Sequence, residues 1–169
     1  MTFTGGEPFA QPDFLMSLLH TCQERDILTA VDTSGYAPWE VIDSMRSSVN
    51  LFLYDLKMMN DTRHIHWTGV SNKLILSNLR RLSELGHTIR VRIPILPGIN
   101  DYEENIRASG EFLAGLPSIP PIQLLAYHNI AEGKYSGLGL SYGLSIQQPD
   151  EGQMEKCARL LTQYGLKVI

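Results

Sequence analysis

Short apolar runs alternate with longer amphipathic stretches along almost the whole chain of 169 residues. The longer stretches carry apolar residues at helical spacing, whereas the short runs are apolar almost without interruption. Strands of that kind are typical of a parallel sheet covered by helices. We expect strands at 1–4, 28–33, 50–56, 88–96, 121–127 and 166–169, and helices at 12–25, 38–46, 71–85, 102–113 and 150–164. A glycine-rich loop is expected at 133–143.

This pattern predicts a single α/β domain over residues 1–169, since no domain break or repeat interrupts it. Hydrophobic residues make up 43% of the chain, enough for a core that needs no disulfide or metal. Periodicity alone leaves open whether the sheet belongs to a barrel or is open and doubly wound. Both architectures bind ligands at the carboxyl ends of their strands, so polar residues there are the site candidates.

The composition argues against several classes of partner. The net charge is -4, and a weakly acidic chain does not favour nucleic acid, because phosphate binding needs clustered Lys and Arg. No apolar run approaches the roughly 20 residues that span a bilayer, and no signal peptide is visible, so we expect a cytoplasmic protein without a membrane partner. Cys22 and Cys157 occupy apolar positions of expected helices, which predicts buried thiols and no disulfide.

Polar residues follow or lie within five of the expected strands. They are Thr4-Gly5-Gly6-Glu7-Pro8, Asp32-Thr33-Ser34-Gly35, Asp55-Leu56-Lys57, Arg90 with Arg92 before Pro97-Gly98, and Tyr127-His128. Glycines let a ligand approach the backbone, carboxylates accept from ammonium or hydroxyl groups, and a lysine pairs with a ligand carboxylate. Taken singly, each stretch also has an ordinary explanation as a turn or a surface ion pair.

Two pairs of residues need separate treatment. Arg90 and Arg92 point to the same face of one strand, and charge inside a parallel sheet is costly unless it is paired, which favours a lined cavity. His64 and His66 have metal-like spacing, but two histidines are too few for a metal site. We therefore interpret both histidines as loop residues.

Together these motifs resemble the radical S-adenosylmethionine (SAM) family, and within it the glycyl-radical-enzyme activating enzymes of the pyruvate formate-lyase activating type. The resemblance runs over nearly the whole chain. It rests on Thr4-Gly5-Gly6-Glu7-Pro8, Asp32-Thr33-Ser34-Gly35, Asp55-Leu56-Lys57-Met58-Met59-Asn60-Asp61, Thr68-Gly69-Val70-Ser71-Asn72, Pro94-Ile95-Leu96-Pro97-Gly98 and Leu124-Leu125-Ala126-Tyr127-His128. A lone Gly-Gly-Glu is weak, but the ordered set at these spacings is specific.

The resemblance implies a partial (β/α) TIM-like barrel and a set of residue roles. Gly5, Gly6 and Glu7 hold the methionine ammonium of SAM, largely through backbone carbonyls, and Lys57 pairs with its carboxylate. The resemblance places Asp32, Asp55 and His128 near the ribose or has them order the site. Arg92 contacts the glycine loop of a partner enzyme, a role for which Arg90 competes.

The resemblance also implies a [4Fe–4S] cluster that reduces SAM, and a radical that abstracts a hydrogen atom from a glycine of the partner glycyl radical enzyme. The family holds this cluster with a C-x3-C-x2-C motif upstream of the Gly-Gly-Glu strand. Cys22 and Cys157 do not form that motif, so we expect a C-terminal portion whose first βα unit or units and cluster ligands are missing. Such a chain alone is expected to be inactive, without tightly bound SAM or cluster, and to self-associate through the exposed edge at 1–4. In the full enzyme, a flavodoxin or ferredoxin-type protein supplies electrons.

Two other functions stay open at this point. One is a radical SAM enzyme with another reaction, such as base or peptide modification. The other is a non-catalytic module that keeps a nucleotide or partner site.

Overall fold

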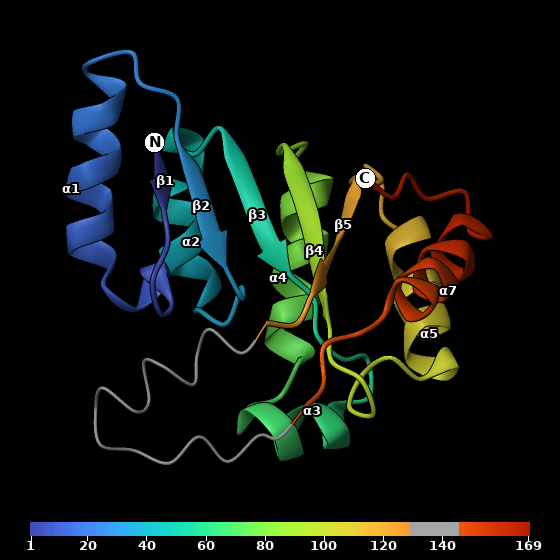
Figure 1. Cartoon of the computed structure of the whole chain (residues 1–169). Coiled ribbons are helices and arrows are strands. Elements are labelled where there is room, and N and C mark those ends of the chain that lie inside the picture. The colour runs from blue at the N-terminus through green and yellow to red at the C-terminus, as the bar shows by residue number, and fades with distance from the viewer. Residues whose placement is uncertain (129–145) are drawn as a thin grey trace.

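The computed structural model describes residues 1–128 and 146–169, and within them five parallel strands form one sheet (Figure 1). The strands are β1 (Thr2–Phe3), β2 (Ala30–Thr33), β3 (Leu51–Asp55), β4 (Ile89–Ile95) and β5 (Ile122–Ala126). The helices are α1 (Pro12–Gln23), α2 (Trp39–Met45), α3 (Asp61–Thr68), α4 (Lys73–Glu84), α5 (Glu103–Ala114) and α7 (Glu151–Thr162), with 3-10 turns at Pro8–Ala10 and Arg46–Ser48.

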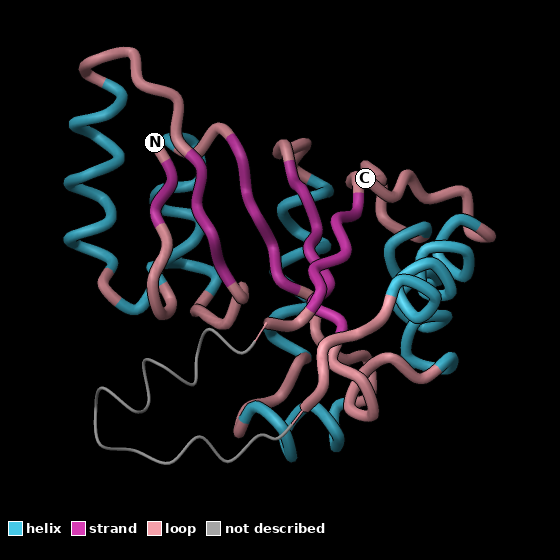
Figure 2. Tube along the Cα trace, in the orientation of Figure 1, coloured by secondary structure: helices cyan, strands magenta, loops and turns pink. Residues whose placement is uncertain are grey.

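The order of the strands settles the architecture that periodicity left open. The spatial order is β1-β2-β3-β4-β5, and every pair is parallel. A doubly wound sheet reverses its winding at a switch point, whereas right-handed crossovers that always step to the next strand keep their helices on one side. Figure 2 shows the helices on the outside of a curved row of strands. The chain is therefore part of a (β/α) barrel, as predicted.

The two faces of the sheet differ in burial. Along β4 every second residue is fully buried against the helices, including Val91, Ile93 and Ile95, and the residues between them are half-buried. On β3 the buried pair is Phe52 and Tyr54. The strands thus have one sealed face and one concave, partly open face, although the apolar runs suggested burial on both. The concave face is where charged side chains can lie.

The structure corrects two sequence-based expectations. His64 and His66 are not loop residues, since both lie in α3, which Asn60 caps at its start and Gly69 ends with a φ of 79°. Residues 166–169 form a single bridge, Ile122 to Val168, and no full strand. The glycine-rich stretch 133–143 lies outside the described residues. In the described part of the chain, no helix is long and apolar enough to cross a membrane.

The outer edge of β1 has no strand partner among the described residues. A cavity of about 300 Å³ lies beside it, lined in part by Phe3, Phe14 and Leu18, and the Phe14 side chain is 62% exposed. Unpaired edges next to apolar surface are prone to pairing with another chain. We therefore expect concentration-dependent self-association, measured by light scattering. A monomer that persists at high concentration would contradict this prediction, and F14K is the variant expected to weaken association.

Candidate functional site

The turn after β1 is tied to the end of β2 by the carboxylate of Glu7. Its Oε1 accepts from Thr33 Oγ1 at 2.7 Å, and its Oε2 accepts from the backbone N–H and the hydroxyl of Ser34 at 2.9 and 2.6 Å. A fourth, longer bond of 3.3 Å comes from Phe9 N. Both carboxylate oxygens are occupied in this way, so the turn offers a ligand its backbone and not the Glu7 side chain.

The two glycines before Glu7 leave open space beside that backbone. A Cβ added at Gly5 or Gly6 would meet no atom within 4 Å, and Gly5 has a φ of 144°, where side chains are rarely accepted. A ligand can therefore approach the peptide groups closely. The expected role of Gly5 and Gly6, in which their carbonyls receive an ammonium group, fits this open backbone.

An arginine joins two carboxylates across the concave face. Arg92 on β4 donates from Nε and Nη2 to Asp55 Oδ1 at 3.0 and 2.7 Å, and Nη2 also contacts Asp32 Oδ1. Asp32 Oδ2 accepts from Thr4 Oγ1 at 2.9 Å, so the cluster links the residue after β1 to β2, β3 and β4. Burial alone would lower the pKa of Arg92, but the charge of Asp55 and the hydrogen bonds to both carboxylates outweigh it and raise the pKa. The guanidinium is firmly charged.

The structure places Arg90 on the same concave face, two residues before Arg92. Its Nε is buried and has no hydrogen-bond partner among the described residues. Charge on this strand was expected to be paired, and Arg92 is paired with Asp32 and Asp55. Contact between Arg92 and a partner's glycine loop stays a prediction, as does the competing role of Arg90.

Lys57 stands beside this cluster, just after β3. Its Nζ lies 3.6 Å from Asp55 Oδ2, and its side chain is 38% exposed, so the ammonium keeps access to a ligand. It lines a cavity of about 230 Å³ together with Glu7, Ser34, Tyr36, Asp55, His64, Thr68, Val70 and Ile75. A lysine with one carboxylate neighbour at a cavity wall is suited to pairing with a ligand carboxylate.

Three buried asparagines fix the backbone around Lys57. Asn100 donates to Lys57 O at 3.0 Å, and Asn105 accepts from Met59 N at 2.9 Å. Asn72 donates to the carbonyls of Met58 and Met59 at 2.9 and 2.8 Å. Asn72 was part of a recognised motif, but neither Asn100 nor Asn105 was predicted as a site residue. The sequence signal that could have indicated Asn100 and Asn105 is a polar residue at a position where an apolar one would be expected.

His128 is not joined to this cluster by any hydrogen bond or ion pair within the described ranges. It is exposed, two residues beyond the end of β5. Of the expected site residues, hydrogen bonds and ion pairs join Asp32, Asp55, Lys57 and Arg92. Glu7 lines the same cavity as Asp55 and Lys57, whereas Gly5 and Gly6 line the cavity beside β1. The role of His128 near the ribose stays a prediction.

The donor set for an iron–sulfur cluster is not found in residues 1–128 and 146–169. Cys22 on α1 and Cys157 on α7 are free and buried, as predicted, and burial raises the pKa of the Cys157 thiol. No group of three or more His, Cys, Asp or Glu side chains in these ranges could hold a metal ion. The described residues therefore do not fit a [4Fe–4S] cluster, which needs several thiolates.

The family model for the radical SAM superfamily matches residues 1–109, which include every residue of this cavity. The chain belongs to the radical SAM superfamily, among the glycyl-radical-enzyme activating enzymes. Trans-4-hydroxy-L-proline dehydratase activating enzyme from Clostridioides difficile is 41% identical over 95% of this chain and 54% of its own length. Pyruvate formate-lyase 1-activating enzyme from Escherichia coli is 32% identical over 100% of this chain and 70% of its own.

A solved structure shares both the fold and the extent of this radical SAM chain. It is a domain of pyruvate-formate lyase-activating enzyme from Bacteroides vulgatus, with a TM-score of 0.85 and 39% identity over 100% of this chain and 96% of that one. The chain spans about half the length of the first curated relatives that it matches. A piece of this size from a relative has thus been crystallised as a domain.

Proposed function

We propose that this chain is the SAM-binding portion of an activating enzyme that generates a glycyl radical on a partner enzyme. The observation that carries the proposal is the cavity that Lys57, Asp55 and Glu7 line. Asp55 belongs to the Asp32–Arg92–Asp55 cluster, and Glu7 follows the open Gly5-Gly6 backbone, which lines the neighbouring cavity beside β1. The names of the relatives support the activating role. Several glycyl radical enzymes are named among them, so the particular partner is not specified.

The residues divide the binding work as follows. Backbone carbonyls at Gly5 and Gly6 accept from the ammonium of SAM, and Lys57 donates to its carboxylate. Asp32, Asp55 and His128 lie near the ribose or order the site. SAM, when bound and reduced, supplies the radical that removes a hydrogen atom from the partner's glycine. In the complete protein the cluster ligands come from outside the described residues, Arg92 contacts the partner's loop, and a cytoplasmic flavodoxin or ferredoxin-type protein delivers electrons.

Lys57→Met tests the proposed SAM site. Because the variant loses the cation proposed to pair with the ligand carboxylate, we expect affinity for SAM and for S-adenosylhomocysteine to fall about tenfold or more, in line with roughly 1.5–3 kcal/mol for a charged hydrogen bond. NMR titration of the isolated chain measures both affinities. Lys167→Met removes an exposed lysine elsewhere and should change nothing. Equal affinities in wild type and Lys57→Met would contradict the proposed role of Lys57.

One observation favours the non-catalytic alternative for the chain by itself, namely the missing cluster donors in the described residues. Anaerobic reconstitution with iron and sulfide distinguishes a chain that carries only a ligand site from a chain that also holds the cluster. Retained SAM binding without a cluster is expected for a chain that carries the ligand site only. A stoichiometric [4Fe–4S] signal would show that the chain supplies its own cluster ligands and would overturn that view.

A further inference from the structure

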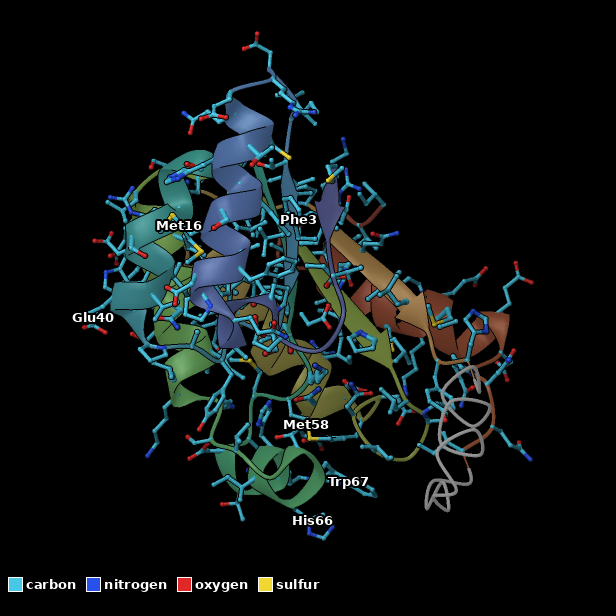
Figure 3. The ribbon with its side chains drawn as sticks, turned by 90° about the vertical axis from the view of Figure 1, so that its left-hand side faces the viewer. Phe3, Met16, Glu40, Met58, His66 and Trp67 are labelled. Atoms are coloured by element: carbon cyan, nitrogen blue, oxygen red, sulfur yellow. The ribbon has the colours of Figure 1, made fainter. Side chains whose placement is uncertain are left out.

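His64 is the single buried residue of helix α3. Its neighbours Ile65 and Trp67 are 46% and 41% exposed, whereas His64 is 3% exposed. Figure 3 shows His66 and Trp67 projecting outward from this helix. An apolar side chain would fill the buried position of a short helix without any hydrogen-bonding requirement. The imidazole therefore needs an explanation for each of its two nitrogens.

The first nitrogen, Nδ1, is explained by the turn that follows α3. It lies 2.7 Å from Val70 O and 2.9 Å from Thr68 Oγ1. A carbonyl oxygen can only accept a hydrogen bond. The Thr68 hydroxyl donates to His64 O at 2.7 Å, so its oxygen also acts as an acceptor toward the ring. Both neighbours thus require a proton on Nδ1, and this network assigns the neutral ring the Nδ1–H tautomer.

The second nitrogen, Nε2, therefore carries a lone pair. No hydrogen bond within the described residues reaches it, since the ring contacts of His64 all involve Nδ1. His64 lines the same cavity as Lys57 and Ser34. The wall of this cavity thus includes a side chain with an unpartnered acceptor, His64, beside one with a strong donor, Lys57.

We propose that Nε2 of His64 accepts a hydrogen bond from SAM bound in this cavity, which adds His64 to the ligand-binding residues. The inference rests on the proposed SAM site. The ligand offers three kinds of donor to an acceptor at this position: its ammonium group, its ribose hydroxyls and the amino group of its adenine. The Thr68–Val70 turn acts through the ring, because it fixes the tautomer that leaves Nε2 unprotonated.

His64→Asn separates ligand contact from a merely structural role. The amide nitrogen of asparagine can take the place of Nδ1 and donate to Val70 O, but nothing replaces Nε2. We expect a thermal midpoint close to that of wild type and a three- to tenfold loss of affinity for S-adenosylhomocysteine, measured by NMR titration. His66→Asn makes the same change two residues away on the exposed side of α3 and should leave affinity unchanged.

Nitrogen-15 spectra of the ring provide the second readout. Wild type without ligand should show the Nδ1–H tautomer, and S-adenosylhomocysteine should shift the Nε2 resonance in the direction of an accepted hydrogen bond. 5′-Methylthioadenosine keeps the adenine and the ribose but lacks the ammonium, so a shift with this ligand assigns the nucleoside part of SAM, and a shift only with S-adenosylhomocysteine assigns the ammonium.

Three outcomes would count against these proposals. If wild type binds S-adenosylhomocysteine and His64→Asn binds it equally well, the His64 inference fails while the SAM site stands. If the Nε2 resonance does not move when the protein is saturated with S-adenosylhomocysteine, the His64 inference also fails while the SAM site stands. If wild type binds neither SAM nor S-adenosylhomocysteine, the proposed site itself is overturned and the His64 inference with it.

Discussion

Replacing Arg92 with methionine is expected to destabilise the chain by about 2–4 kcal/mol, a value between that of exposed and of fully buried ion pairs. The side chains of Arg92, Asp32 and Asp55 are 16%, 21% and 22% exposed. Without the guanidinium, two carboxylates remain close together in a partly buried place with no cation between them. Lys57 lies near Asp55 only, at 3.6 Å, and cannot replace the bridge to Asp32.

Urea unfolding measures this loss, and Arg159→Met is the matched control. Arg159 also pairs with a carboxylate, Glu155 at 3.2 Å, but the two side chains are 68% and 60% exposed. Removing such a pair should cost below about 1 kcal/mol. If Arg92→Met were no less stable than Arg159→Met, the cluster would not hold β2, β3 and β4 together.

A double variant separates two effects of Arg92→Met: the loss of the attraction to the carboxylates, and the repulsion between the two carboxylates that remain. Asp55→Asn combined with Arg92→Met removes one of the two carboxylates left behind, so the double variant should be more stable than Arg92→Met alone. Arg92→Lys should fall between wild type and Arg92→Met, because an ammonium cannot reproduce the separate Nε and Nη2 contacts. A double variant no more stable than Arg92→Met would mean that repulsion between the two carboxylates is negligible.

The strand–helix pattern was sufficient to predict the fold of the described chain because each element carries its own periodicity. The helix at 71–85 shows this well, since Ile75, Leu79 and Leu82 recur on one face and are buried in α4. Helix α3 was missed for the opposite reason. Its stretch Asp-Thr-Arg-His-Ile-His-Trp-Thr has no apolar face, and only the flanking Asn60 and Gly69 mark its ends.

The sequence could predict those residues of the candidate site whose positions are determined by the ends of the strands. Parallel strands bring Asp32, Asp55 and Arg92 to one face, and this follows from the sequence once the strand order is known. What Glu7 contacts does not follow, because its partners depend on the path of the turn in three dimensions. The same holds for Asn100 and Asn105, whose hydrogen bonds to the 57–59 backbone join segments more than 40 residues apart.

Glu7→Gln is expected to weaken both folding and ligand binding, although the side chain keeps its shape. The carboxylate accepts from Ser34 N and Ser34 Oγ through Oε2, and from Thr33 Oγ1 and Phe9 N through Oε1. An amide has one accepting oxygen and one donating nitrogen. Whichever way it turns, its nitrogen faces a backbone N–H, so one donor loses its acceptor.

The loss should be about 2–3 kcal/mol, because charged hydrogen bonds are involved and an unmet donor adds its own desolvation cost. Glu40→Gln is the matched control, since Glu40 is exposed in α2 and points away from the molecule (Figure 3). Its stability should stay within about 0.5 kcal/mol of wild type. Urea unfolding measures both.

The ligand readout shows what Glu7 does for the site. A turn released from β2 no longer holds the carbonyls of Gly5 and Gly6 in place, so affinity for S-adenosylhomocysteine should fall in Glu7→Gln even where the protein is fully folded. Titration at low temperature, well below the unfolding transition, separates this effect from loss of folded protein. Unchanged affinity in folded Glu7→Gln would mean that the turn keeps its position without the Thr33 and Ser34 bonds, and that Glu7 contributes to stability alone.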